Sequence, residues 1–178
     1  AIAGLSGPYR AALEAKWREW LKGRYPAAAS LREAWVVGAE APGVEMLKNG
    51  GFASGLEGWS PQGPKKDVCT LAVGEGPDGG RAAVFGVLKT PAQSYGNQLH
   101  QVGLNLEEGR TYTLRFQGRA DPPREISAYL SFADGPWTAV AERHSVRLDK
   151  RWAEKVVIFK VRGVDPAHRT RLSLGLGA

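Results

Sequence analysis

Apolar and polar residues alternate along most of the chain after Pro42. In residues 111–117, the side chains of Tyr112, Leu114 and Phe116 share one face, while threonine, arginine and glutamine share the other. This alternation predicts a half-buried antiparallel strand. Similar stretches predict strands at residues 44–48, 67–73, 81–88, 96–106, 110–120, 125–132, 138–147, 152–161 and 170–176.

Clusters of glycine, proline and aspartate separate the predicted strands. They lie at residues 74–80, 121–123, 134–136 and 163–166. Short strands with turns at this spacing, and no helix between them, predict an all-β fold in which two antiparallel sheets form a β-sandwich.

The N-terminal part of the chain has a helical period instead. Leu13, Trp17, Trp20 and Leu21 recur at the spacing of one apolar helix face, and Gly23 can end this helix.

A break follows at Tyr25-Pro26, because the residue before a proline is disfavoured in the α region. A second short helix is expected around Trp35, so that residues 1–43 form a helical hairpin and residues 44–178 form the sandwich. A hairpin of this size cannot bury three tryptophans. Its apolar face must therefore pack on the sandwich or on a domain outside this sequence.

Length and composition exclude several classes of protein. A sandwich within 178 residues buries enough surface to fold without disulfides, and the single cysteine, Cys69, cannot form an internal one. No apolar run is long enough to span a membrane, and the first residues lack the layout of a signal peptide. We expect the chain to be a piece of a longer protein.

Most of the formal net charge of +6 comes from residues after Gly109. Basic residues there alternate with apolar or acidic neighbours, as on the solvated face of a sheet. A surface for an anionic glycan or a nucleic acid is the alternative interpretation.

No group of residues predicts catalysis. His100, His144 and His168 stand far apart without neighbouring cysteine or paired carboxylates, which argues against zinc. No nucleophile elbow or phosphate-binding loop is present. No two carboxylates stand out as a pair for glycoside hydrolysis.

Two motifs carry a family resemblance. Residues 48–60 read K-N-G-G-F-A-S-G-L-E-G-W-S, and residues 106–114 read L-E-E-G-R-T-Y-T-L. Both resemble family 4/9-type carbohydrate-binding modules, which are jelly-roll β-sandwiches. The resemblance implies a non-catalytic protein, secreted or at the cell surface, with a carbohydrate ligand as partner, no membrane partner and no expected nucleic acid.

The tryptophan-rich segment Trp17–Trp35 resembles an outer helical region of (β/α)8-barrel glycoside hydrolases. This second resemblance implies a multidomain glycoside hydrolase as the parent protein. The catalytic barrel of that enzyme would then be a partner of the sandwich.

Sugar binding requires flat aromatic faces together with planar amides or guanidinium groups. By resemblance, Tyr95 and Trp137 are the first candidates for sugar platforms, with ordinary packing as the alternative. The polar candidates lie on or near the predicted strands: Gln98, Gln101, Gln117, Arg119 and Tyr129. We expect Trp59 and Trp152 to be structural.

Family members end with a further strand that often supplies an aspartate to a structural calcium ion. This sequence stops at Leu172–Ala178. By resemblance, the chain would lack that strand, the cysteine partner of Cys69 and part of a calcium site. We therefore expect an open sheet edge beside the opening strand.

Two other functions stay open. The first is a structural sandwich that braces an enzyme barrel and binds no sugar, which is favoured by Pro61-Gln62 where some members carry an aromatic residue. The second is an electrostatic binder of acidic polysaccharide or nucleic acid.

Overall fold

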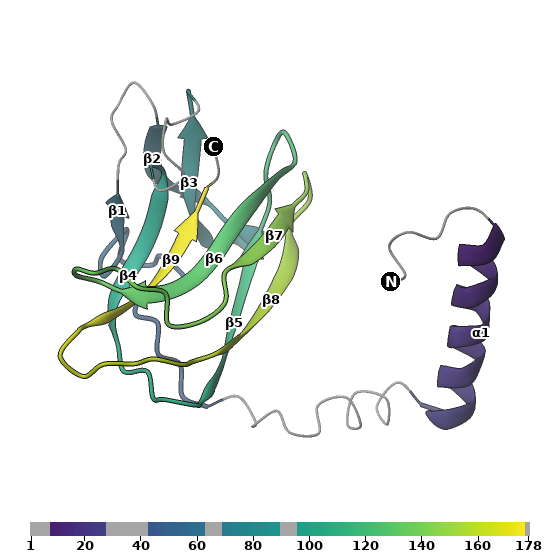
Figure 1. Ribbon diagram of the computed structural model, residues 1–178. Coiled ribbons are helices and arrows are strands. Elements are labelled where there is room, and N and C mark those ends of the chain that lie inside the picture. The colour runs from purple at the N-terminus through teal and green to yellow at the C-terminus, as the bar shows by residue number, and fades with distance from the viewer. Residues whose placement is uncertain (1–7, 28–42, 63–68, 90–95, 177–178) are drawn as a thin grey trace. The chain divides into compact units, whose positions relative to one another are not determined.

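The computed structural model describes residues 8–27, 43–62, 69–89 and 96–176 (Figure 1). The chain divides into two compact units, Ala1–Ala41 and Pro42–Ala178. We describe each unit by itself.

The first unit contains helix α1, Pro8–Arg24, which confirms the predicted helix. None of its residues is buried. Trp17 and Trp20 stack with their ring centroids 5.0 Å apart, and each is 48% exposed. The predicted second helix and Trp35 lie outside the described residues. The apolar stripe of α1 is therefore formed as predicted, and what covers it stays a prediction.

The second unit is a β-sandwich, which confirms the predicted fold class. Its larger sheet has five antiparallel strands in the order β1-β4-β9-β6-β7 (Figure 1). These strands are β1 Ser60–Gln62, β4 Gln98–Leu104, β9 Thr170–Gly175, β6 Arg124–Phe132 and β7 His144–Leu148.

Two antiparallel pairs pack against the same core. The pair β2–β3 consists of Cys69–Glu75 and Arg81–Val87, joined through the short 3-10 helix Pro77–Gly79. The pair β5–β8 consists of Thr111–Gly118 and Ala153–Lys160. Among the described strands, neither pair hydrogen-bonds to the other or to the larger sheet. The open edge expected from the resemblance stays a prediction.

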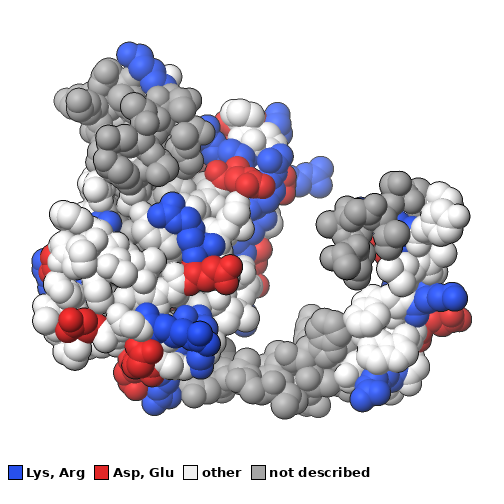
Figure 2. Space-filling view, in the orientation of Figure 1, with Lys and Arg blue, Asp and Glu red and all other residues white. Residues whose placement is uncertain are grey.

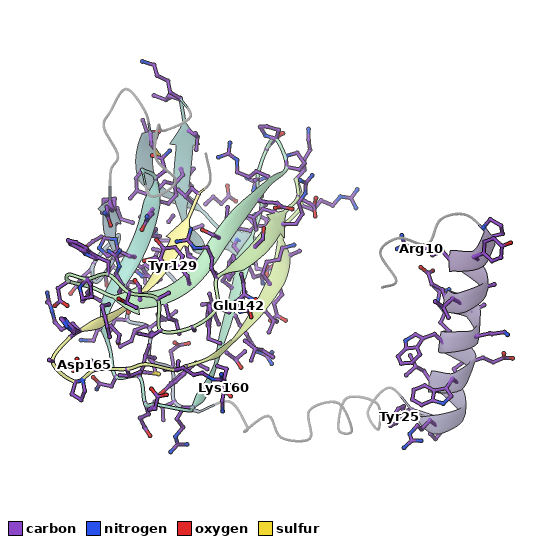
Figure 3. All side chains as sticks on the ribbon, in the orientation of Figure 1. Arg10, Tyr25, Tyr129, Glu142, Lys160 and Asp165 are labelled. Carbon is purple, nitrogen blue, oxygen red and sulfur yellow. The ribbon has the colours of Figure 1, made fainter. Side chains whose placement is uncertain are left out.

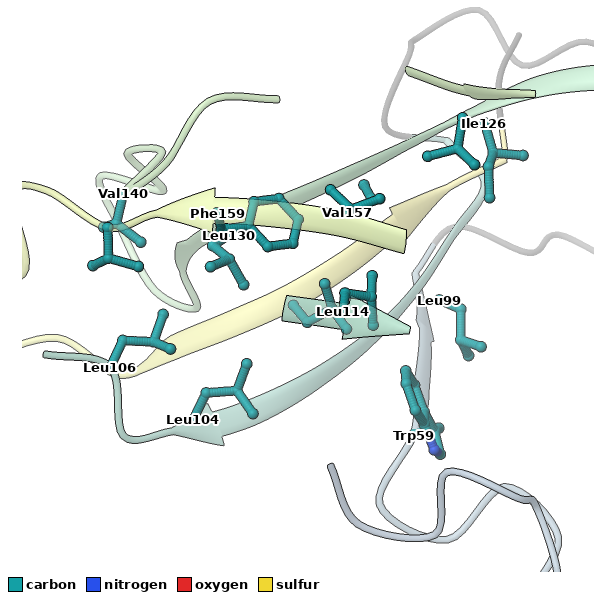
Figure 4. Packing of buried hydrophobic residues seen from close by; sticks show 14 of the residues in the cluster. Trp59, Leu99, Leu104, Leu106, Leu114, Ile126, Leu130, Val140, Val157 and Phe159 are labelled. Carbon is teal, nitrogen blue, oxygen red and sulfur yellow. The ribbon is translucent and has the colours of Figure 1, made fainter. Parts of the chain in front are cut away.

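The core forms where the alternating apolar residues of these strands meet (Figure 4). In the five-stranded sheet, Leu172 lies opposite Leu130. From β8, Phe159 points into the cluster and is only 1% exposed. The period-two pattern of the sequence thus places one face of each strand in a shared apolar interior.

The motif at residues 48–60 forms a turn that closes one end of this core. Asn49 adopts a positive φ of 51°, and its side-chain amide donates to the carbonyls of Gly55 and Glu57 at 3.0 Å each. The indole N–H of Trp59 donates to the Asn49 carbonyl at 3.2 Å, and the Trp59 ring packs near Phe52. The expected structural role of Trp59 is confirmed.

One predicted strand is absent, and one observed strand was not predicted. Residues 44–48 are not a strand, because side chains satisfy their backbone: the amides of Leu47 and Lys48 donate to Glu45 and Gln101. Strand β1 was not predicted, since its sequence Ser60-Pro61-Gln62 lacks alternation. The remaining strands fall at the predicted positions, although 138–147 shortens to β7 with one bridge at Ala139.

Strand β8 offers a matched test of the core. We expect Phe159→Ala to lower the free energy of unfolding by about 3–5 kcal/mol, because it leaves a cavity in a packed cluster. On the same strand, Ile158 is 54% exposed, and Ile158→Ala should cost less than about 1 kcal/mol. Urea unfolding of the full chain measures both values, and equal losses would contradict the assignment of Phe159 to the core.

Candidate functional site

The outer side of the five-stranded sheet carries the side chains that alternate with the core residues. Three rows of paired residues cross the strands there. The rows are Gln62, Gln98, Gly175 and Ser127; then Ser60, His100, Ser173 and Tyr129; then Val102, Arg171 and Ser131. We call this surface the polar face. Its polar side chains contrast with the leucines on the reverse side of the same strands.

Arg171 belongs to the central strand β9, and its side chain extends over the polar face. Its Nε donates to Ser131 Oγ at 3.3 Å, and its Nη1 donates to Gln62 Oε1 at 3.1 Å. The residue is 7% exposed. One guanidinium group thus spans the sheet from β6 to the edge strand β1.

Tyr129 lies on β6, next to the central strand β9 (Figure 3). Its hydroxyl donates to Gln98 Oε1 at 2.8 Å, a bond that reaches from β6 over β9 to β4. The guanidinium carbon of Arg143, just before β7, sits 4.1 Å from the centroid of the Tyr129 ring. This distance is typical of a cation–π contact.

Several buried polar atoms of this region have no hydrogen-bond partner in the described part of the chain. They are Ser173 Oγ and His100 Nδ1 on the polar face, and both amide atoms of the adjacent Asn97. Buried polar groups are nearly always paired with protein or ordered water, so unpaired ones call for an explanation. Their unused capacity is what a polar ligand or bound water could satisfy.

The electrostatics of the polar face are those of a cationic site. Burial, and then the nearby Arg171 charge, lower the pKa of His100 below its ordinary value. His100 is therefore neutral near pH 7 while Arg171 stays charged.

A turn extends β6 beyond Ser131. The amide of Trp137 donates to the Asp134 carbonyl at 2.9 Å, and Ala139 then bridges back to Ser131. Asp134 Oδ1 lies 2.9 Å from His168 Nδ1, and this hydrogen bond is the main reason that the pKa of Asp134 is lowered. The Trp137 side chain is 63% exposed on this anchored turn.

Comparison with known proteins decides the family. The sequence profile of the family described as a carbohydrate binding domain, of type 4/9, matches residues 44–175. The chain belongs to this family.

Solved structures show the same fold for the carbohydrate-binding domain. A structure of a CBM4 module has a TM-score of 0.57 and 22% identity, covering 74% of this chain and 89% of that chain. The enzymatically active domain of tailspike protein 4 from bacteriophage CBA120 has a TM-score of 0.53 and 16% identity, covering 74% of this chain and 19% of that chain. A search of curated proteins finds no significant match.

The residues predicted as sugar contacts separate onto different surfaces of the domain. Gln98 and Tyr129 lie together on the polar face, and Trp137 lies on the turn beyond it. Tyr95 lies outside the described residues. Only part of the predicted set is thus brought together.

Gln101 points to the core side of β4, opposite Leu172. Its Oε1 accepts from the Lys48 amide at 2.7 Å, and its Nε2 donates to the Lys48 carbonyl at 2.8 Å. Both ends of the amide therefore hold the opening segment, and the side chain is 3% exposed. Its geometry is structural.

Gln117 lies on β5 of the pair β5–β8, and Arg119 follows the end of that strand. Gln117 is exposed on the outer face, opposite Glu154. The Arg119 guanidinium carbon lies 5.2 Å from the centroid of Trp152. The core separates these residues from the polar face, so they cannot contact the same ligand surface.

Arg171, Arg143, His100 and Ser173 were not singled out from the sequence. The alternation Thr170-Arg171-Leu172-Ser173-Leu174 already indicates that Arg171 and Ser173 share one face. It does not indicate which strands lie beside them. Among the described residues, no three His, Cys, Asp or Glu side chains cluster as metal ligands. No helix in the described part is long and apolar enough to cross a membrane.

Gln101 and Gln117 allow a matched stability test. Replacing Gln101 with leucine removes both part-buried hydrogen bonds to the Lys48 backbone and should lower the free energy of unfolding by about 1–3 kcal/mol in total. Replacing the exposed Gln117 with leucine should change the free energy of unfolding by less than about 0.5 kcal/mol. Denaturant unfolding distinguishes the two, and a Gln101→Leu variant as stable as the native chain would disprove the structural role.

Stability should also depend on pH through His100. Because the pKa of His100 is lowered in the folded chain, the unfolded chain binds a proton first as the pH falls. The free energy of unfolding therefore decreases below about pH 6.5.

A His100→Asn variant lacks this contribution and should lose less stability between about pH 7.5 and 5.5 than the native chain does. Urea unfolding at the two pH values gives the comparison. An identical loss in the two proteins would exclude His100 as a source.

Proposed function

We propose that the chain is a non-catalytic module that binds a polysaccharide or oligosaccharide on the polar face. The observation that carries this proposal is the group of polar side chains across β4, β9 and β6, some of them buried with unused hydrogen-bonding capacity. Strands spaced 4.7–4.9 Å apart make a five-stranded face roughly 19 Å wide. Such a width suits several consecutive sugar units.

Sugar hydroxyls both donate and accept hydrogen bonds, so they match amides, hydroxyls and guanidinium groups. On the polar face these partners are Gln98, Tyr129 and Arg171, which hydrogen bonds already hold in place. Fixed partners bind with a smaller loss of conformational entropy than mobile ones. This preorganisation favours ligand binding.

We further propose aromatic stacking by Trp137 and Tyr95 beside this face. Trp137 is exposed on the turn after β6, so its side chain is not part of the core. Gln101, Gln117 and Arg119 are left out of the proposed site for the geometric reasons given above.

The parent protein in this proposal is a secreted, multidomain glycoside hydrolase. A tethered module raises the effective concentration of the enzyme at its substrate, so modest affinity is sufficient.

Figure 2 shows Lys and Arg interspersed with Asp and Glu on the side that it displays. Interspersed charges support a local site better than an extended nucleic-acid surface.

Trp137→Ala tests the stacking role. We expect binding of the best ligand, from a panel of β-glucans, xylan and mannan, to weaken by about 1–3 kcal/mol, because an aromatic contact is lost. Thermal stability should change little. Trp20→Ala on α1 removes another half-exposed tryptophan from a different unit and serves as the control.

Isothermal titration of the full chain measures these affinities. Unchanged binding in Trp137→Ala would exclude that residue as a platform. Absence of binding to every neutral and acidic glycan tested would instead favour a structural sandwich that braces an enzyme.

A further inference from the structure

Arg171 is a buried cation with no anionic partner among the described residues. More than nine-tenths of its surface is buried, yet its hydrogen bonds go only to neutral oxygens, those of Ser131 and Gln62. No described carboxylate lies within ion-pair distance of it. An unpaired buried charge destabilises a protein strongly.

Some exposed cations of the same unit are paired with carboxylates. Arg147 approaches Asp149 at 3.6 Å, and Lys150 approaches Asp121 at 3.2 Å. Such exposed pairs contribute little to stability. In the part of the chain that the structure describes, the buried cation Arg171 thus has no carboxylate partner, whereas these exposed cations have one. The acidic residue on the outer side of this sheet, Glu125, is hydrogen-bonded by Ser145 near the β7 edge.

A second guanidinium faces the same surface. Arg143 is exposed and stacked on Tyr129, and no described carboxylate forms an ion pair with it. Stacking holds the guanidinium plane while its N–H groups remain available at the plane's edge.

The two glutamines of the polar face reinforce this excess of donors. Gln98 Oε1 accepts from Tyr129, and Gln62 Oε1 accepts from Arg171. Neither Nε2 group has a hydrogen-bond partner among the described residues. The amide oxygens are thus occupied, while the N–H donors remain for a ligand.

We infer that the polar face recognises an acidic saccharide, with Arg171 and Arg143 binding its anionic groups. This inference rests on the proposed function and adds the class of ligand. Carboxylates and sulfate esters share the required chemistry, because both present acceptor oxygens that match the guanidinium fork. The site supplies donors and positive charge together, whereas a neutral glycan would leave the Arg171 charge without a counterion.

The experiment uses the full chain and matched probes. Oligogalacturonate and oligomannuronate are compared with their carboxyl-reduced, neutral counterparts, and sulfated galactan is compared with its desulfated form. Titration calorimetry at low and at about 0.5 M salt measures the affinities, since salt screens charge pairs. Single-stranded DNA and polyglutamate serve as non-saccharide polyanions.

We expect at least one acidic saccharide to bind about tenfold or more tightly than its neutral counterpart, as an ion pair of moderate strength would produce. The uronates and the sulfated galactan show which anionic group is preferred. Arg143→Gln should remove most of that preference, because binding of the acidic form weakens when the charge is lost.

Arg115→Gln, on the outer face of β5, makes the same charge change away from the site and should keep the preference. Arg171→Gln should also abolish the preference in a variant that melts as one cooperative unit. Because Arg143 is exposed, its variant keeps the test decisive if Arg171→Gln does not fold.

Other outcomes overturn the inference. Equal affinity for acidic and neutral forms, or binding of neutral glycans alone, would refute it while leaving the proposed function intact. Binding of DNA or polyglutamate as tightly as the saccharides would indicate general polyanion binding and refute it too. No binding to any saccharide would refute both.

Discussion

The alternation of side chains on the five-stranded sheet is the constraint on which the rest of this domain depends. Leu172 and Leu130 must face the core, and this fixes Arg171, Ser173 and Tyr129 on the other side. Because the side-chain period of a strand is two, a slip of one residue would turn the arginine toward the apolar core and the leucines toward the polar face. The apolar interior therefore holds the polar face in register.

Side-chain hydrogen bonds then link the strands on both faces of this sheet. The bond from Tyr129 to Gln98 links β6 to β4, and Arg171 links β6 to β1. On the core side, the Gln101 amide ties β4 to the segment before the first turn. Two glutamines of one strand thus serve opposite sides of the sheet, and the difference follows from their separation by three residues.

The sequence predicts much of the fold but less of the site. The helical period identifies α1, and alternation together with turn residues identifies most strands, because burial and turn geometry are local properties of the chain. In a regular strand, two residues three positions apart point to opposite faces, so the sequence alone would place Gln98 and Gln101 on opposite sides of the sheet. The irregularity near Gly103 obscured this alternation. Placing Arg171 beside Gln62 depends on pairing between residues 109 positions apart, which no local pattern specifies.

Because Arg143 stacks on Tyr129, a ligand that stacks on the same ring must compete with this arginine. The guanidinium of Arg143 already covers the Tyr129 ring, since its carbon lies 4.1 Å from the ring centroid. A sugar ring that lies flat on Tyr129 must first displace this guanidinium, which costs about 0.5–2 kcal/mol of cation–π attraction. A ligand that accepts hydrogen bonds from Arg143 leaves the stack intact. In the proposed function, Arg143 would therefore compete with a neutral sugar for the face of the Tyr129 ring.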